Sequence, residues 1–190
     1  MKYFARITIL LKFSGNKIKD IRANVMKESM NEVFLGLGGN IGQRFDVLRE
    51  AVHQIQVEIG SVQKLSPLYE TQAWGSNSKN LYLNQVIKIE TNLDALSVLE
   101  IIGRIEKLFG RKRTASQNSD RTLDIDILLF NAEIIQEKTL QIPHPRMHLR
   151  NFVLYPICDI DEDLMHPLLL KTMAELKNTC IDQMEIKQTG

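Results

Sequence analysis

Cysteine is scarce in this chain, which limits what disulfides can contribute to it. Only Cys158 and Cys180 occur among 190 residues, 22 positions apart and without a CxxC pair. Such sparse cysteines are typical of reduced, buried thiols rather than of a disulfide-stabilised scaffold. We therefore expect two reduced thiols and a reducing, cytoplasmic setting.

Long apolar runs and a strong overall charge are also missing. No run approaches the ~18 apolar residues of a membrane span, and Ile7–Leu11 is shorter than the ~7-residue apolar core of a signal peptide. The net charge is +1, composed of +5 on residues 1–29 and −4 on the rest. A nucleic-acid binder usually carries positive charge on its folded part. We therefore expect neither a membrane nor a nucleic acid as partner.

The chain divides into two parts near Met30. Residues 1–29 show no clean helical or strand period, and Met26 and Met30 are alternative starts. We interpret 1–29 as a dispensable or wrongly included extension, with a weak terminal helix or a targeting segment as alternatives. Residues 30–190, with ordinary globular composition, are expected to form one domain.

Apolar periodicity predicts alternating strands and helices from residue 33 onward. Apolar residues 33–37 followed by glycines predict a buried strand, and residues 62–70, 82–91 and 122–130 predict three more. Spacings of three and four predict a helix over 45–59 ended by Gly60, and a second, capped by Asp94 and ended by Gly110. The expected core-facing residues of the first helix are Phe45, Leu48, Val52, Ile55 and Ile59.

The order of these elements predicts the fold class. Strand-helix-strand-strand-helix-strand is the α+β, ferredoxin-like split βαβ arrangement, with an antiparallel sheet. A short strand pair before Pro143 and a final helix near 172–178 complete the expectation. Two helices on one face of the sheet would leave the other face free for a site.

Two carboxylates on the fourth strand are the first candidate for chemistry. Because side chains alternate along a strand, Leu123, Ile125 and Ile127 point into the core and Asp124 and Asp126 emerge together on the other face. Their Cα atoms would lie ~6–7 Å apart. Mg²⁺ favours such hard oxygen ligands and completes its shell with water and phosphates. A solvated strand face is the alternative for this pattern alone.

A local basic cluster strengthens the magnesium interpretation. Residues 111–120 form a polar loop of ten residues, a length typical of functional loops. Arginine binds phosphate oxygens bidentately, so the cluster indicates a magnesium-nucleotide site. Its members are Arg104, Lys107, Arg111, Lys112, Arg113 and Arg121.

Other motifs carry weaker signals. Gly36–Gly42 is neither a Walker A motif nor a well-spaced Rossmann fingerprint, and we interpret it as a tight strand-to-helix turn. Tyr69–Gly75 and Tyr82–Gln85 combine aromatic faces with amides, as binding of a flat heterocycle requires. His144 and His148 have metal-pair spacing, but no HExxH motif accompanies them.

Taken in order, the motifs resemble a known family. The sequence contains GLGGN, SPLYET, YLNQVIKIET, RIEKLFGR, RTLDIDILLF and IPHPRMHLRNFVLYP. This series is similar to the 6-hydroxymethyl-7,8-dihydropterin pyrophosphokinases over residues 31–165. The resemblance implies a monomeric, ferredoxin-like enzyme of folate biosynthesis. Such an enzyme transfers pyrophosphate from ATP to the pterin hydroxymethyl group and releases AMP.

The resemblance also implies roles for particular residues. Asp124 and Asp126 would hold two Mg²⁺ ions, and Asp126 would bridge both and draw the substrate proton. Arg113 and Arg121 would contact the transferring group. The nucleotide pocket would comprise Glu106, Arg111, Ile127 and His144, and the pterin pocket Thr71, Gln72, Trp74, Tyr82, Asn84, Arg150 and Phe152.

Several positions depart from the family pattern. Asn118–Asp120 stands where Trp-Gly-Pro is common, which removes an aromatic cover over the pterin. Gly103 replaces a usual Gln, Thr114 a loop Lys, Pro145 a commoner Tyr, and Gly39 a usual Ser. These changes bear on affinity and turnover rather than on family membership.

Two other function classes are alternatives for this sequence. An RNA-binding module on the same fold would need exposed aromatics on the central strands, whereas Asp124 and Asp126 would repel RNA. An NAD-dependent oxidoreductase would need a parallel sheet and different glycine spacing. Magnesium-dependent protection by an ATP analogue would separate these alternatives.

Overall fold

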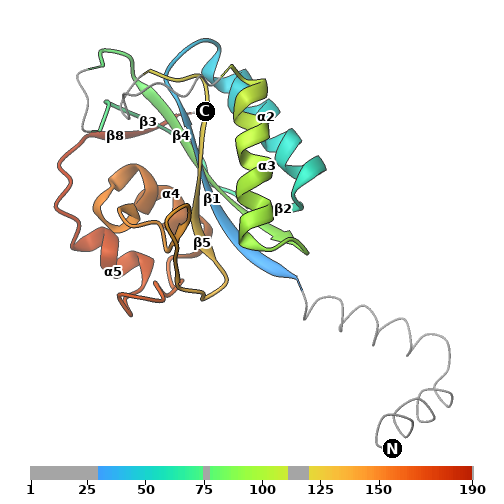
Figure 1. Cartoon of the computed structure of the whole chain (residues 1–190). Coiled ribbons are helices and arrows are strands. Elements are labelled where there is room, and N and C mark those ends of the chain that lie inside the picture. The colour runs from blue at the N-terminus through green and yellow to red at the C-terminus, as the bar shows by residue number, and fades with distance from the viewer. Residues whose placement is uncertain (1–29, 75–77, 111–119, 190) are drawn as a thin grey trace, which may run out of the picture. The chain divides into compact units, whose positions relative to one another are not determined.

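A six-stranded antiparallel sheet is the central element of the described residues (Figure 1). The computed structural model describes residues 30–74, 78–110 and 120–189, so the expected extension 1–29 lies outside it. The strand order is β5 (Asp124–Phe130), β1 (Asn31–Gly39), β4 (Tyr82–Thr91), β3 (Leu68–Thr71) and β8 (Ile186–Thr189), with β2 (Ser61–Leu65) also paired to β4. All these pairs are antiparallel, which confirms the ferredoxin-like fold and leaves no parallel dinucleotide-binding sheet among the described residues.

The second expected strand is two strands, β2 and β3, rather than one. The break falls at Ser66 and Pro67, because proline has no N–H for the ladder. Ser66 bridges the break, since its hydroxyl accepts from the Val86 N–H at 3.0 Å. The chain then resumes as β3 beside the same strand, β4.

Helices α2 (Arg44–Glu58) and α3 (Ala95–Leu108) cover one face and form the larger core with it. Asp94 caps α3 as expected, accepting from the Ser97 N–H at 2.8 Å. One expectation for α2 was wrong, because Phe45 is 47% exposed. Leu48, Ile55 and Ile59 are buried as expected, and the buried face of the helix also includes Ala51.

Gly60 ends α2 for a different reason from the one expected. Its φ is not positive; instead, a Cβ there would lie 2.2 Å from the Glu90 carbonyl oxygen. Gly110, by contrast, follows α3 with φ +81, as a left-handed helix end requires.

The opposite face of the sheet is only partly free, which corrects the expectation of an open face. Helix α4 (Asn151–Asp161), which the sequence did not predict, and α5 (Met173–Asn178) pack there in a second core (Figure 1). Pro156 lies inside α4 and made the segment look irregular. Its apolar spacing is nevertheless helical, with buried residues Val153, Leu154, Ile157 and Ile160.

Short elements complete the domain. The expected strand pair is present as β6 (Ile135–Gln136) and β7 (Gln141–Ile142), followed by a 3-10 turn, η3 (Met147–Leu149). Both cysteines are free, as expected, and half-buried. Among the described residues, none of the helices is long and apolar enough to cross a membrane.

Candidate active site

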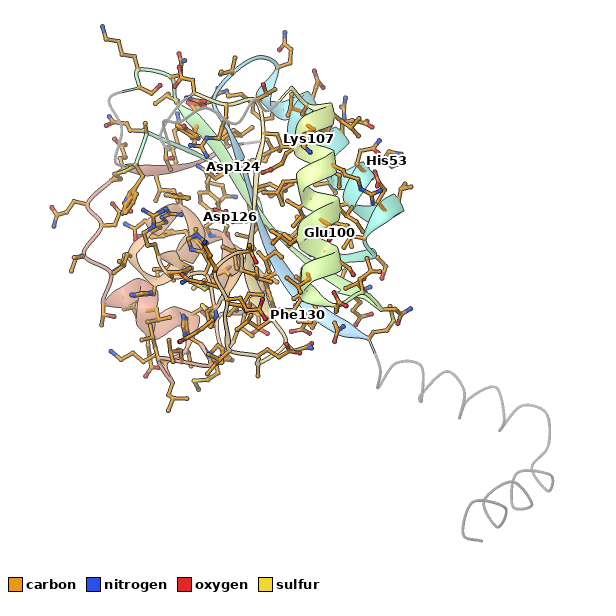
Figure 2. The ribbon with its side chains drawn as sticks, viewed as in Figure 1. His53, Glu100, Lys107, Asp124, Asp126 and Phe130 are labelled. Atoms are coloured by element: carbon orange, nitrogen blue, oxygen red, sulfur yellow. The ribbon has the colours of Figure 1, made fainter. Side chains whose placement is uncertain are left out.

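Strand β5 presents Asp124 and Asp126 along one edge of the sheet. Ile125 and Ile127 alternate with them and are buried in the larger core. In Figure 2 the two aspartates follow one another along β5, with the α3 residues Glu100 and Lys107 on the other side. The strand begins at Asp124 rather than at Thr122, and the alternation predicted from the sequence holds across the pair.

Basic groups surround the two carboxylates. The Arg121 guanidinium donates to Asp124, with Nη1 2.6 Å from Oδ2. Arg150 Nη1 lies 4.0 Å and His144 Nε2 3.8 Å from Asp126 Oδ2. The carboxylate of Asp126 is also the more open, with 42% of its side chain exposed against 25% for Asp124. It is therefore accessible to a ligand.

His144 is neutral at physiological pH. Burial, and then the charges of Arg150 and Arg146, lower its pKa to about 4. Its Nδ1 accepts from the Arg146 N–H at 3.2 Å, which assigns the remaining proton to Nε2, facing Asp126. The backbone N–H of His144 donates to the Leu128 carbonyl at 2.9 Å and so fixes the ring beside β5. His144 can therefore donate one hydrogen bond into the site.

A cavity of about 450 Å³ opens beside the carboxylates, between the sheet and the start of α4. It brings together predicted site residues that lie up to 81 positions apart in the sequence, although their individual roles remain predictions. These residues are Thr71, Gln72, Trp74, Tyr82, Asn84, Arg121, Asp124, Asp126, His144, Arg150 and Phe152.

One wall of the cavity is a stack of aromatic rings and a guanidinium group. The Arg150 guanidinium carbon lies 4.8 Å from the Trp74 ring centroid and 5.4 Å from that of Phe152. Arg150 is only 9% exposed, and its Nε is buried with no hydrogen-bond partner among the described residues. Burial lowers the pKa of this guanidinium, while Asp126 opposes that shift. A flat ligand could therefore stack against this aromatic wall. It would lie beside the Arg150 guanidinium, whose charge is only partly compensated by hydrogen bonds.

The floor of the cavity holds a preoriented amide. Asn84 Nδ2 donates to Thr71 Oγ1 at 3.0 Å, which fixes the amide plane. Gly38 makes room for it, because a Cβ at that position would lie 2.9 Å from Asn84 Oδ1. Burial raises the pKa of the neighbouring Tyr82 phenol, although Arg121 opposes that shift.

The residues predicted to bind the nucleotide do not all line one cavity. Ile127, Asp126 and His144 line a second, shallower hollow of about 360 Å³ on the β6–β7 side. Glu106 lines neither hollow; it is 8% exposed, and its carboxylate accepts from the Ile125 N–H at 2.9 Å. Arg111 and Arg113 lie outside the described residues.

Sequence reasoning missed several lining residues. Arg146 lines the larger cavity, and residues 138–141 line the second hollow. Arg146 stands inside the PHPRM motif, which could have indicated it. The loop at 138–141 has no comparable signal.

The carboxylate oxygens of Asp124 and Asp126 suit a hard cation whose remaining ligands are not supplied by the part of the chain that the structure describes. Among the described residues, no group of three or more His, Cys, Asp and Glu side chains could hold a metal ion. A cation at Asp124 and Asp126 would therefore complete its shell with water and substrate oxygens, the usual situation for Mg²⁺.

A pair of carboxylates, with guanidinium groups beside an aromatic-walled cavity, is the arrangement of an enzyme that transfers a phosphate-containing group to a small flat acceptor. The family model of 7,8-dihydro-6-hydroxymethylpterin-pyrophosphokinase (HPPK) matches residues 34–162. The chain belongs to this family, and it is therefore a pyrophosphokinase.

Individual relatives support the assignment. The 2-amino-4-hydroxy-6-hydroxymethyldihydropteridine pyrophosphokinase of Aquifex aeolicus (strain VF5) is 37% identical over 148 residues, covering 78% of this chain and 91% of that protein. Its namesake from Bacillus subtilis (strain 168) is 40% identical over 131 residues, covering 68% and 78%. The folic acid synthesis protein fol1 of Pneumocystis carinii is 33% identical over 170 residues, covering 90% of this chain and 22% of that protein. Together with the family match, it places the chain in folate synthesis.

Solved structures share the fold. That of Plasmodium falciparum HPPK-DHPS wild type with pteroate has a TM-score of 0.64 at 18% identity, covering 78% of this chain. The chain spans 44% of the length of that protein. At this identity the likeness concerns the fold alone.

Proposed function

We propose that the protein transfers the pyrophosphoryl group of ATP to 6-hydroxymethyl-7,8-dihydropterin in a Mg²⁺-dependent reaction of tetrahydrofolate synthesis. The products are AMP and the pterin diphosphate. The observation that carries the proposal is the position of Asp124 and Asp126 at the rim of an aromatic-walled cavity of about 450 Å³. Such a volume suits a small bicyclic ligand together with the group that it receives.

The pterin would lie between the rings of Tyr82 and Phe152, with Trp74 beside them. Asn84 would bind its amide edge, since the contact with Thr71 already fixes the orientation of that side chain. Gln72 and Arg150 complete the wall of the cavity. In this pose the hydroxymethyl group points toward Asp126.

The chemistry is an in-line displacement at the β-phosphorus of ATP. The hydroxymethyl oxygen forms a bond to this phosphorus, the bond to the bridging α–β oxygen breaks, and AMP leaves with that electron pair. The hydroxymethyl proton passes toward the Asp126 carboxylate. Two Mg²⁺ ions bound by Asp124 and Asp126 would supply neutralisation of the polyphosphate charge.

The remaining residues would position the nucleotide. Arg121 would contact the transferring phosphates, together with Arg111 and Arg113. The Nε2 proton of His144 would donate to the nucleotide, because the low pKa keeps this ring neutral. Ile127 would provide an apolar wall, and Glu106 would act by holding the backbone of Ile125.

We further propose that the enzyme is a cytoplasmic monomer that needs no nucleic acid or membrane. The RNA-binding alternative required exposed aromatics on the central strands. Phe34 of β1 is instead 1% exposed and packed in the second core, which argues against that alternative.

The test is AMP release from ATP and the pterin, with and without Mg²⁺, for the wild type, Asp126→Ala and Asp126→Asn. Asp46→Ala is the matched control, because Asp46 is 62% exposed and pairs only with Arg49 in a surface ion pair. We expect both Asp126 variants to lose turnover while the control retains it. ADP in place of AMP, or wild-type rates for folded Asp126→Ala, would refute the proposal.

A further inference from the structure

A cluster of polar side chains outside the cavity joins three segments that border it. Asp120 uses both carboxylate oxygens: Oδ1 accepts from Asn40 Nδ2 at 2.7 Å, and Oδ2 accepts from Asn80 Nδ2 at 2.9 Å. Ser78 Oγ lies 3.3 Å from Asn40 Nδ2 and accepts from the Asn80 N–H at 3.2 Å. We call Asn40, Ser78, Asn80 and Asp120 the Asp120 clasp. It connects the ends of the β1–α2, β3–β4 and α3–β5 segments.

The clasp continues directly to Arg121. Asn40 Oδ1 accepts from the Arg121 N–H at 2.8 Å, and the Asn40 N–H donates to the Arg121 carbonyl at 2.9 Å. Asn40 therefore holds the backbone of Arg121 on both sides. The guanidinium of Arg121 in turn lies 2.6 Å from Asp124 at the rim of the cavity.

The carboxylate sets the orientation of the Asn40 amide. An ionised carboxylate only accepts hydrogen bonds, so the Asn40 nitrogen must face it and the Asn40 oxygen must face the Arg121 N–H. Hydrogen bonds from Ser78, and then from Asn40 and Asn80, lower the pKa of Asp120, which keeps it ionised at neutral pH. Asn40 is 5% exposed, so a reversed amide would place two donors together away from water.

Close backbone packing holds this arrangement in place. A Cβ at Gly39 would lie 2.1 Å from the Thr122 carbonyl oxygen, so the segment that precedes Asn40 lies directly against the start of β5. The side-chain contacts of Asn40 and this backbone contact therefore act on the same segment, Arg121 and Thr122.

We propose that Asp120 is a positioning residue for pyrophosphoryl transfer, acting through Asn40 on the backbone of Arg121. It connects the two loops beside the cavity to the strand that carries the carboxylates. Its removal should impair transfer more than pterin binding, because Trp74 and Asn84 have separate contacts with Arg150 and Thr71. The fold should survive, since Arg44 independently holds the Leu81 carbonyl at 2.7 Å and Glu70 at 3.2 Å.

The experiment combines a truncation with a charge exchange. Asp120→Ala removes the acceptor, and Asn80→Asp places a second carboxylate against Asp120. The double variant Asn80→Asp/Asp120→Asn exchanges the two side chains. An amide at position 120 can then donate to a carboxylate at position 80, which restores one donor and one acceptor. We would measure kcat, the thermal midpoint and the pterin Kd from the fluorescence of Trp74, the only tryptophan.

We expect kcat to fall about tenfold in Asp120→Ala and in Asn80→Asp, because sub-ångström errors in positioning are costly to transfer. The double variant should return to within about threefold of the wild type. In Asp120→Ala, pterin Kd should change less than about threefold and the thermal midpoint by only a few degrees. Asp46→Asn, outside the clasp, should match the wild type throughout.

Two results would overturn the role of Asp120: a wild-type kcat in Asp120→Ala, or a double variant no better than Asn80→Asp. A fall in activity that only follows the folded fraction would also overturn it. The inference rests on the proposed function, but the two fail differently. A wild type that releases no AMP would refute the proposed function. Equal activity of the wild type and Asp120→Ala would refute the positioning role of Asp120 alone.

Discussion

Replacing Arg150 with methionine should stabilise the protein while impairing its activity. The Arg150 guanidinium is buried between two aromatic rings, and in the part of the chain that the structure describes its Nε has no hydrogen-bond partner. Methionine has a similar length and no charge, so it can fill the same slot between Trp74 and Phe152. The variant separates what the side chain does for folding from what it does for the reaction.

The expected magnitude follows from the contacts. Loss of two ring contacts costs ~0.5–2 kcal/mol each, and the attraction to Asp126 is limited to about 1 kcal/mol by its partly exposed carboxylate. Against this, the variant removes an unsatisfied buried donor, worth ~1–3 kcal/mol, and the desolvation of a charge, worth several kcal/mol. We expect a net stabilisation of about 1–2 kcal/mol, or roughly 2–8 °C in Tm.

The assay pairs denaturant unfolding with steady-state kinetics. In the proposed complex the Arg150 guanidinium would donate one charge-assisted hydrogen bond to the substrates, so Arg150→Met should lower kcat/KM by roughly 10–100-fold. Arg150→Lys is the control: it keeps the charge but not the planar group, and it should not gain stability. If Arg150→Met were destabilised by more than about 1 kcal/mol, the ring contacts would outweigh the burial of charge and the reasoning would fail.

Three further outcomes are expected. Gly103→Ala should raise the free energy of unfolding by about 0.5–1 kcal/mol, because a Cβ there meets nothing within 4 Å inside α3; denaturant titration measures this, and a loss of stability would contradict the packing described. Arg121→Ala should lower kcat far more than it raises the pterin KM, which initial-rate kinetics resolve; an effect confined to KM would assign Arg121 to binding alone. Burial, and then His148, lower the pKa of His166, whose Nδ1 accepts from the N–H groups of Leu168 and Leu169. Folding therefore favours the neutral ring. The contribution of His166 to the free energy of unfolding is fully present above its ordinary pKa of 6.5 and declines as the pH falls below that value. His166→Asn, which keeps an acceptor, should flatten this decline between pH 7.5 and 5 in denaturant titrations.

Local rules predicted the parts of the fold that local interactions determine. The cap at Asp94 and the alternation along β5 depend on residues within one or two turns of the chain, so the sequence contains all the necessary information. The split between β2 and β3 at Pro67 follows from the same kind of rule and could have been predicted. Phe45 could not, because its exposure depends on which face of α2 the sheet receives.

The second core escaped prediction for a tertiary reason. Pro156 opposes a helix locally, yet burial of Leu154 and Ile157 against the sheet outweighs that cost. Strand β8 has only a weak apolar pattern, and its formation depends on the open edge of β3. Local patterns indicated Asp124, Asp126 and the segments Tyr69–Gly75 and Tyr82–Gln85. Arg150 and Phe152 were found only through the family resemblance, since no local pattern connects Thr71 with Phe152.

The dependence of the cavity on α4 links ligand binding to one part of the domain. Arg150 and Phe152 stand at the first turn of α4, which packs in the second core, whereas the carboxylates stand on β5, which contributes Ile125 and Ile127 to the larger core. A partial opening that releases α4 would remove the side of the wall that Phe152 forms, while the larger core would still hold β5. A pterin-like inhibitor would accordingly act as a bridge between two folding units, and its binding energy would appear chiefly as slower amide exchange in α4 and α5.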